Sequence, residues 1–193
     1  MDWNMARPLS EEKRQALLDA AADFVAASGT GASTARIAKA AGVSVGTLFT
    51  YFPTKDDLLN QLFVDIETNL TETMLAPYPA DASAKDRLFA VWNRLIDWGL
   101  KQATARKALR QLKVSDRVTA ESRRQCHAMQ LDARAMVEEC LAGHAAPDRI
   151  AFYIDTILFD LADISINAIT ARPKESDAIR QAGFDLFWNG SAA

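Results

Sequence analysis

The stretch AAGVSVGTLFTYFPTKDDLL, residues 40–59, holds a very short helix between two stop signals. Ser44 is a favourable N-cap and Pro53 cannot continue a helix, so the pattern predicts a helix from Val45 to Phe52. Gly42, just before it, can adopt the left-handed conformation that ends a preceding helix. We therefore expect two short helices joined by a tight turn, which is the arrangement of a helix-turn-helix.

The predicted helix over 45–52 has two edges of different chemistry. One edge follows the spacing of a core-facing stripe: Val45, Leu48, Phe49 and Phe52. The opposite edge is a ridge rich in hydroxyl groups that ends beside Lys55: Thr47, Thr50, Tyr51 and Thr54. A connector helix with an ordinary solvated face would also show such a ridge. A helix that is buried on one side and laid in the major groove of DNA on the other explains both edges better.

Composition and charge are those of an ordinary globular chain. Of 193 residues, 49% are hydrophobic and 24% are charged. No run approaches the ~18 apolar residues of a membrane span, and the N-terminus lacks the apolar core of a secretory signal, so we expect a cytoplasmic protein with no membrane partner. The net charge of −3 argues against nucleic acid, but residues 24–55 contain three cations and no acidic residue: Arg36, Lys39 and Lys55. This local excess of positive charge favours binding to the phosphates of DNA.

Apolar residues recur at helical spacing along nearly the whole chain, and no alternating strand pattern is convincing. Caps, glycines and prolines predict nine helices, over about 11–28, 34–41, 45–52, 55–75, 85–101, 103–113, 119–141, 147–172 and 176–188. In this scheme Thr34 caps the second helix. The segment from Ala76 to Ser83, with two prolines, is the clearest linker. The expected fold class is all-α.

Catalysis and metal binding are disfavoured. The only histidines, His127 and His144, have no serine, cysteine or carboxylate in a catalytic arrangement. Cys126 and Cys140 would lie about 21 Å apart along one helix, too far for a disulfide. We expect neither an enzyme nor a cofactor or metal site.

Residues 33–59, STARIAKAAGVSVGTLFTYFPTKDDLL, closely resemble the DNA-binding signature of the TetR family of repressors. The resemblance implies a nine-helix fold with a DNA-binding domain over 1–54 and a ligand-binding and dimerisation domain over 55–193. It also implies a homodimer that binds a palindromic double-stranded DNA operator and releases it when a small-molecule effector binds.

Matching positions of the family assigns roles to individual residues. The phosphate contacts implied in this way are Thr34, Thr47, Tyr51 and Lys55. Gly46 and Thr50 match positions close to the bases, and Arg36 matches a groove contact. Phe49 stands where many relatives have tyrosine. Val45 stands where a polar residue is frequent, so its base contact would be apolar, as with a thymine methyl group.

A second, looser resemblance concerns the effector. WNRLIDWGLKQATARKALRQLKVSD, residues 92–116, together with MARPLSEEKRQALLDAA near the N-terminus, resembles the efflux-associated, RamR-type repressors of the family. It implies a multidrug response to lipophilic, often cationic compounds. On this basis the expected ligand contacts are Phe63, Trp92, Asp155, Leu158 and Phe159. Alternatively, the aromatic residues belong to the core and Asp155 pairs with an arginine such as Arg87 or Arg94.

The segment IAFYIDTILFDLADISINAIT, residues 150–170, is apolar on almost every side. One predicted stripe consists of Ile150, Ile157, Leu161, Ile164 and Ala168, and the opposite one of Ala151, Asp155, Leu158, Phe159 and Ala162. Two buried faces suggest two partners, the chain's own domain and a second subunit. We expect a dimer interface formed by Ile157, Leu161 and Ile164 with Ile179 and Phe187 of the last helix.

Two other functions stay open. One is a TetR-like activator, or a repressor without an effector. The other is a helical-bundle enzyme or ligand carrier in which the helix-turn-helix is incidental.

Overall fold

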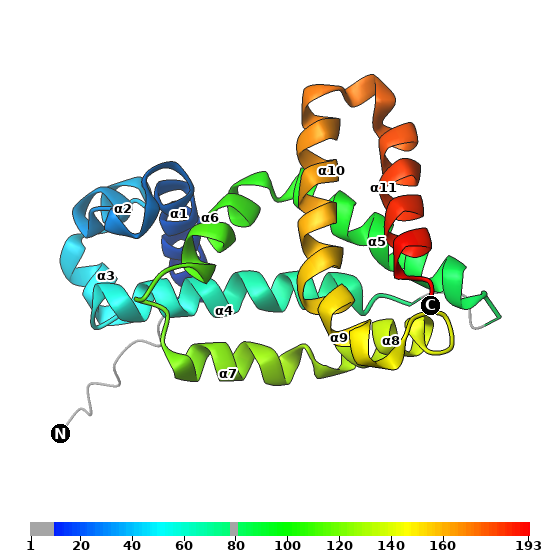
Figure 1. Ribbon diagram of the computed structural model, residues 1–193. Coiled ribbons are helices and arrows are strands. Elements are labelled where there is room, and N and C mark those ends of the chain that lie inside the picture. The colour runs from blue at the N-terminus through cyan, green and yellow to red at the C-terminus, as the bar shows by residue number, and fades with distance from the viewer. Residues whose placement is uncertain (1–9, 78–80) are drawn as a thin grey trace. The chain divides into compact units, whose positions relative to one another are not determined.

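The computed structural model describes residues 10–77 and 81–193, and these residues form helices and loops without any strand (Figure 1). The helices are α1 (Glu11–Ser28), α2 (Thr34–Ala40), α3 (Val45–Tyr51), α4 (Lys55–Met74), α5 (Ala84–Lys101), α6 (Ala103–Lys113), α7 (Ala120–Met129), α8 (Leu131–Leu141), α9 (Ile150–Phe152), α10 (Phe159–Ala171) and α11 (Ser176–Ser191). The expected all-α fold class is confirmed. The centre of the expected linker, residues 78–80, and the first nine residues lie outside the described part of the chain.

Contacts divide the chain into two compact units. The first consists of the described residues up to Glu67 together with Thr104–Gln125, and the second of Thr68–Ala103 together with Cys126–Ala193. Helices α4 and α7 each contribute to both units, and the functional boundary expected between residues 54 and 55 stays a prediction. Within residues 10–77 and 81–193, no helix has both the length and the apolar character needed to cross a membrane.

Local signals set the short helices of the first unit. Ser10 caps α1, since its side chain accepts a hydrogen bond from the backbone N–H of Lys13. Gly42 has a φ of +69°, the left-handed conformation expected at the turn before α3. The Ser44 side chain then caps α3 by accepting from the backbone N–H of Thr47 at 3.0 Å. Thr34 is the first residue of α2 and Ser33 is its N-cap, so the predicted cap was wrong by one residue.

The core of the second unit is built around α5. Its buried face includes Val91, Trp92 and Ile96, and the helix packs against α8, α10 and α11. The indole N–H of Trp92 donates to the backbone carbonyl of Arg180 at 3.0 Å, so this buried ring has its polar atom satisfied. Helices α10 and α11 run side by side (Figure 1).

The single helix expected over 119–141 is wrong, because α7 and α8 are separate helices that meet at Gln130. Gln130 has φ −83° and ψ −7°, and its N–H bonds to the carbonyls of Cys126 at 3.0 Å and His127 at 3.2 Å. Neither glycine nor proline lies at this break. The sequence therefore carries no glycine or proline signal that would have predicted the interruption.

The segment that leads into α10 also departs from a regular α-helix. Tyr153–Leu158 is a π-helix, whose wider turn shifts the phase of all following residues. The two stripes are confirmed in part: Leu158 and Ala162 of the second stripe are buried, whereas Ala151 and Asp155 of that stripe are exposed and Ile157, Leu161 and Ile164 of the first stripe face outward. The buried residues of this segment and α10 are Ile154, Leu158, Ala162, Ser165, Ile166 and Ile169.

Candidate nucleic-acid interface and ligand cavity

Helix α3 buries a narrower face than the sequence predicted. Leu48 and Phe52 are 0% and 1% exposed, whereas Val45 and Phe49 are 39% and 40% exposed. The exposed pair lies on one flank of the apolar stripe, so only the flank around Leu48 and Phe52 faces the core. The prediction that Val45 and Phe49 are core residues was wrong. Both side chains instead add apolar surface to the outer face of α3, where Val45 was expected to meet a base.

The hydroxyl groups of α3 are held by local hydrogen bonds. The Thr47 hydroxyl lies 2.9 Å from the Ser44 hydroxyl, and the Thr50 hydroxyl donates to the carbonyl of Gly46 at 3.0 Å. Because the Thr50 proton is engaged in this bond, its oxygen is best suited to accept a hydrogen bond from a base amino group. An added Cβ on Gly46 would meet no atom closer than 3.7 Å, so this position leaves open space on the surface.

Tyr51 is oriented by the start of α1. Its phenolic oxygen accepts a hydrogen bond from the backbone N–H of Ser10 at 2.9 Å. A hydroxyl that accepts one bond can still donate its proton, and the accepted bond polarises the O–H group. This geometry is compatible with donation to a phosphate oxygen.

The cations of this unit have identifiable neighbours. The exposed Arg36 guanidinium lies over the ring of Phe24, 4.8 Å from its centroid. Partial burial, together with the positive charge of Arg117 nearby, lowers the pKa of Lys55 from its usual value. Arg117 was not found from the sequence because the loop before α7 brings it to Lys55 from far along the chain.

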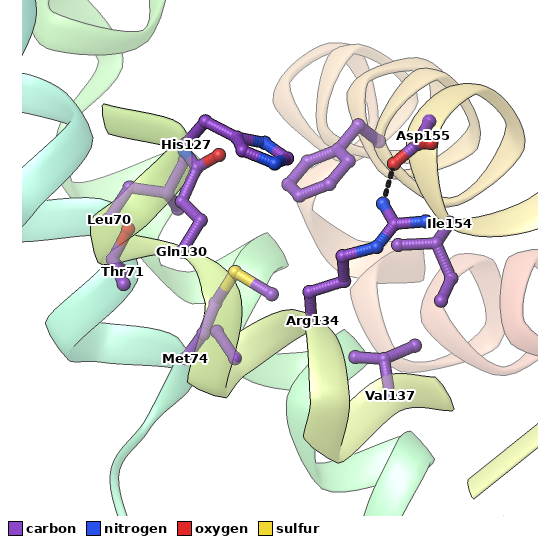
Figure 2. Close-up of a pocket in the computed structure, with 11 residues that line it drawn as sticks. Leu70, Thr71, Met74, His127, Gln130, Arg134, Val137, Ile154 and Asp155 are labelled. Carbon is purple, nitrogen blue, oxygen red and sulfur yellow. Dashed lines mark hydrogen bonds and ion pairs between the residues drawn. The ribbon is translucent and has the colours of Figure 1, made fainter. Parts of the chain in front are cut away.

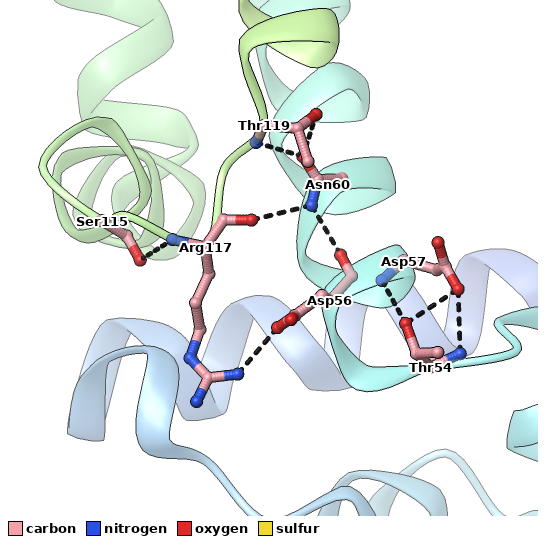
Figure 3. A network of polar contacts seen from close by, with 7 residues as sticks. All are labelled: Thr54, Asp56, Asp57, Asn60, Ser115, Arg117 and Thr119. Atoms are coloured by element: carbon pink, nitrogen blue, oxygen red, sulfur yellow. Dashed lines mark hydrogen bonds and ion pairs between the residues drawn. The ribbon is translucent and has the colours of Figure 1, made fainter.

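A buried amide fixes that loop to the first turns of α4 (Figure 3). The Asn60 side chain donates to the carbonyls of Asp56 at 2.8 Å and Arg117 at 2.9 Å. Its oxygen accepts from the backbone N–H of Thr119 at 2.8 Å and from the Thr119 hydroxyl at 3.1 Å. The Arg117 guanidinium forms an ion pair with Asp56 at 2.7 Å. Asn60 therefore uses its full hydrogen-bonding capacity within the first unit.

A cavity of ≈ 80 Å³ lies in the second unit (Figure 2). Its walls come from α4, α7, α8, the π-helix and α10, and the lining residues are Leu70, Thr71, Met74, His127, Gln130, Ala133, Arg134, Val137, Ile154, Asp155 and Phe159. Apolar side chains form most of this surface, and one arginine and one aspartate are its charged groups. Of the residues expected to contact a ligand, Asp155 and Phe159 lie here.

The other expected ligand contacts lie elsewhere. Trp92 and Leu158 are both 0% exposed and are not among the lining residues of this cavity. Phe63 belongs to the first unit, where the Arg123 guanidinium lies 5.9 Å from its ring centroid. Core packing accounts for Trp92, as the alternative interpretation held.

The open question about Asp155 has an answer in the structure, because its carboxylate pairs with Arg134. This hydrogen bond raises the pKa of Arg134, which also bonds Glu138 at 2.9 Å. The two arginines considered from the sequence have other partners: Arg87 pairs with Glu139, and Arg94 donates to backbone carbonyls that include that of Met74. The Asp155 side chain is 56% exposed, so it is not a buried, uncompensated charge.

An apolar surface remains on α10 and α11. Ile164 is 63% exposed, and Leu186, which is not one of the expected interface residues, is 65% exposed. Ile157, Leu161 and Ile179 are partly exposed. Phe187 is 2% exposed and packs edge-on against Tyr153 of its own chain at 6.5 Å between ring centroids.

Comparisons with known proteins agree with the helix-turn-helix. Residues 17–62 match the sequence model of the tetR family of bacterial regulatory proteins. The fatty acid metabolism regulator protein of Bacillus subtilis (strain 168) is 36% identical over 80 residues, which cover 41% of each chain. The chain thus spans less than half the length of this curated relative.

Solved structures extend the likeness beyond that segment. A protein of Shewanella sp. PV-4, described as a tetR family transcription regulator, superimposes with a TM-score of 0.82 and 27% identity over 94% of this chain and 98% of that one. The regulator FadR of Bacillus subtilis, in complex with stearoyl-CoA, has a TM-score of 0.68 at 19% identity over 91% and 98% of the chains, and shows the shared fold alone. Residues 17–62 thus resemble the DNA-binding segment of tetR family regulators, and the rest of the chain shares the fold of solved regulators of that family.

Proposed function

We propose that this protein is a ligand-responsive transcriptional repressor that binds a palindromic DNA operator as a homodimer. The observation that carries the proposal is α3, a seven-residue helix with Leu48 buried and an outer face of hydroxyl groups, Val45 and Phe49. It lies within the segment that matches the family. The residues proposed to touch DNA are Thr34, Arg36, Val45, Gly46, Thr47, Thr50, Tyr51 and Lys55. The two DNA-binding domains of a dimer would contact half-sites about 34–36 Å apart.

The dimer would form through α10 and α11. Exposed Ile164 and Leu186 support this proposal, because apolar side chains of this size on adjacent helices favour a covered interface. Replacing Ile164 by glutamate should yield monomers or aggregates in light scattering. A dimer of Ile164→Glu that still binds DNA would exclude this interface.

The effector would be a small lipophilic compound bound in the cavity of the second unit. At ≈ 80 Å³ the cavity is smaller than the roughly 300–1,000 Å³ of typical ligand pockets, so binding requires its walls to move. Effector binding would favour a conformer in which the two DNA-binding domains no longer match the operator. The coupling free energy between effector binding and DNA binding would be about 1–3 kcal/mol.

Two observations bear on the effector's chemistry. The RamR-type resemblance suggests lipophilic cations, but Asp155, the only acidic residue among the expected ligand contacts, pairs with Arg134. The names of two relatives, a fatty acid metabolism regulator and a FadR solved with stearoyl-CoA, suggest an acyl compound as a second candidate.

The deciding experiment is to capture fragments of the source genome on the purified protein. Enrichment of fragments that share a palindrome, with binding that weakens steeply as salt rises, supports the proposal. Loss of that binding on adding an effector separates it from a repressor without a ligand, and reporter expression from the captured promoter separates repressor from activator. A ligand carrier or enzyme would enrich no common sequence.

A further inference from the structure

The Arg134–Asp155 pair joins α8 to the π-helix at the cavity (Figure 2). Arg134 lies on α8 just after the break at Gln130, and Asp155 lies in the π-helix. Both side chains line the cavity, and so does Gln130. This ion pair therefore closes one side of a space that is otherwise mostly apolar.

The two partners are not equally easy to release. The Arg134 side chain is 23% exposed and is also held by Glu138, whereas the Asp155 side chain is 56% exposed. Asp155 can therefore move into water at small cost, since an exposed ion pair contributes little. Arg134 would stay in the wall, paired with Glu138 through Nε, and the guanidinium nitrogen that Asp155 had occupied could then donate to another anion.

From this asymmetry we infer that the cavity binds a lipophilic anion whose head group replaces Asp155 on Arg134. Carboxylate and phosphate oxygens fit the donor geometry of a guanidinium group. The apolar chain of the ligand would lie against Leu70, Met74, Val137, Ile154 and Phe159. A lipophilic cation would instead have to displace Arg134 and would lie beside its fixed positive charge. The inference rests on the proposed effector role of this cavity and specifies the sign of the effector's charge.

Asp155 is then an internal competitor for the ligand's site. Its release would remove the ion pair that ties α8 to the π-helix, and the π-helix continues directly into α10. Single π-helical turns inside longer helices occur frequently at functional sites. The ligand head would therefore act on the helix that carries the proposed dimer surface.

The test uses probes that share one twelve-carbon chain and differ in the head: dodecanoate, dodecanoyl-CoA, dodecanol and dodecyltrimethylammonium, each below its micelle concentration. Binding to the full-length protein without DNA is measured by titration calorimetry. We expect an anionic probe to bind the parent most tightly. Tighter binding of free dodecanoate identifies a carboxylate head, and tighter binding of dodecanoyl-CoA identifies a carrier-bound acyl group; both support the inference. Tightest binding of the cation or the alcohol overturns it.

Variants identify the residues that act. Arg134→Gln should lower the affinity for the preferred anionic probe by about tenfold or more, because a hydrogen bond to a charged group is lost. The same variant should change the affinity for dodecanol by less than about twofold. Asp155→Asn should strengthen anion binding by about two- to fivefold by weakening the competitor. Arg172→Gln, which removes an exposed arginine paired with Glu175, is the matched control and should change nothing.

Arg134→Lys covers the case in which the glutamine variant does not fold. It keeps the charge and should retain part of the preference for anions. The inference would be overturned if Arg134→Gln and Arg134→Lys lowered the affinity for charged and neutral probes equally. Weaker anion binding by Asp155→Asn would also overturn it. An operator-binding protein that binds none of the probes would also overturn it and leave the repressor proposal standing. Anion binding without sequence-selective DNA binding would refute the repressor and leave the inference standing.

Discussion

Asn60 offers a direct test of how the first unit holds the loop before α7. Its side chain is 9% exposed and forms hydrogen bonds with Asp56, Arg117 and Thr119. Asn60→Ala removes all of these bonds without changing the exposed ion pair nearby. The backbone N–H of Thr119 and the backbone carbonyl of Arg117 then lose their amide partner.

The expected cost follows from those two backbone groups. A buried polar group left unsatisfied costs about 1–3 kcal/mol, and water can reach part of this site, so we expect a loss of about 2–4 kcal/mol of unfolding free energy. The matched variant Arg117→Ala removes the ion pair with Asp56 but keeps the backbone carbonyl that Asn60 uses. The side chains of that pair are 44% and 56% exposed, so its loss should cost about 0–1 kcal/mol.

Urea unfolding followed by far-ultraviolet circular dichroism measures both variants against the parent. Amide hydrogen exchange at Thr119 measures the local effect and should become faster in Asn60→Ala alone. If both variants lower the unfolding free energy equally, or if Asn60→Ala costs less than about 0.5 kcal/mol, the buried amide does not fix this loop.

Three further outcomes are expected. Tyr51→Phe should weaken operator binding about tenfold or more in gel-shift titrations while circular dichroism is unchanged, and unchanged affinity would remove its phosphate role. Gly183→Ala should cost about 1–3 kcal/mol in urea unfolding, because its Cβ would lie 2.8 Å from buried Trp92, whereas Gly190→Ala has no such neighbour and should be neutral. Burial raises the pKa of Asp65, so the contribution of this carboxyl group to stability falls as pH rises above its unfolded pKa of about 4, and the gain in unfolding free energy from Asp65→Asn should be larger at pH 7 than near pH 4.

The elements that the sequence predicts well are those set by local chemistry. Gly42, Ser44 and Pro53 act on their own backbone neighbours, so the turn and α3 could be located without knowing the rest of the fold. Val45 and Phe49 could not be placed from the helical wheel, because the width of a buried face depends on what packs against it. The family match at residues 17–62 rests on the same local segment.

The ligand cavity was harder to predict for a physical reason. Arg134 and Asp155 are 21 residues apart, on segments whose helical phase changes at Gln130 and within the π-helix. Neither change has a glycine or proline to mark it, so the contact of α8 with the π-helix could not be read from the sequence. The sequence placed Asp155 among the expected ligand contacts, but it could not supply its partner.

The irregular backbone and the ion pair together explain how a small cavity could respond to a ligand. Helix interruptions replace part of the regular hydrogen-bond ladder, so the walls at Gln130 and the π-helix can move at lower cost than intact helix. Exchanging the half-exposed Asp155 for a ligand head on Arg134 replaces one hydrogen bond to a charged group by another, so the exchange itself contributes only a small part of the free energy of ligand binding. The exchange biases the proposed repressor because the ligand-bound conformer lacks the ion pair between α8 and the π-helix, and the strength of the response equals the ligand's differential affinity for the two conformers.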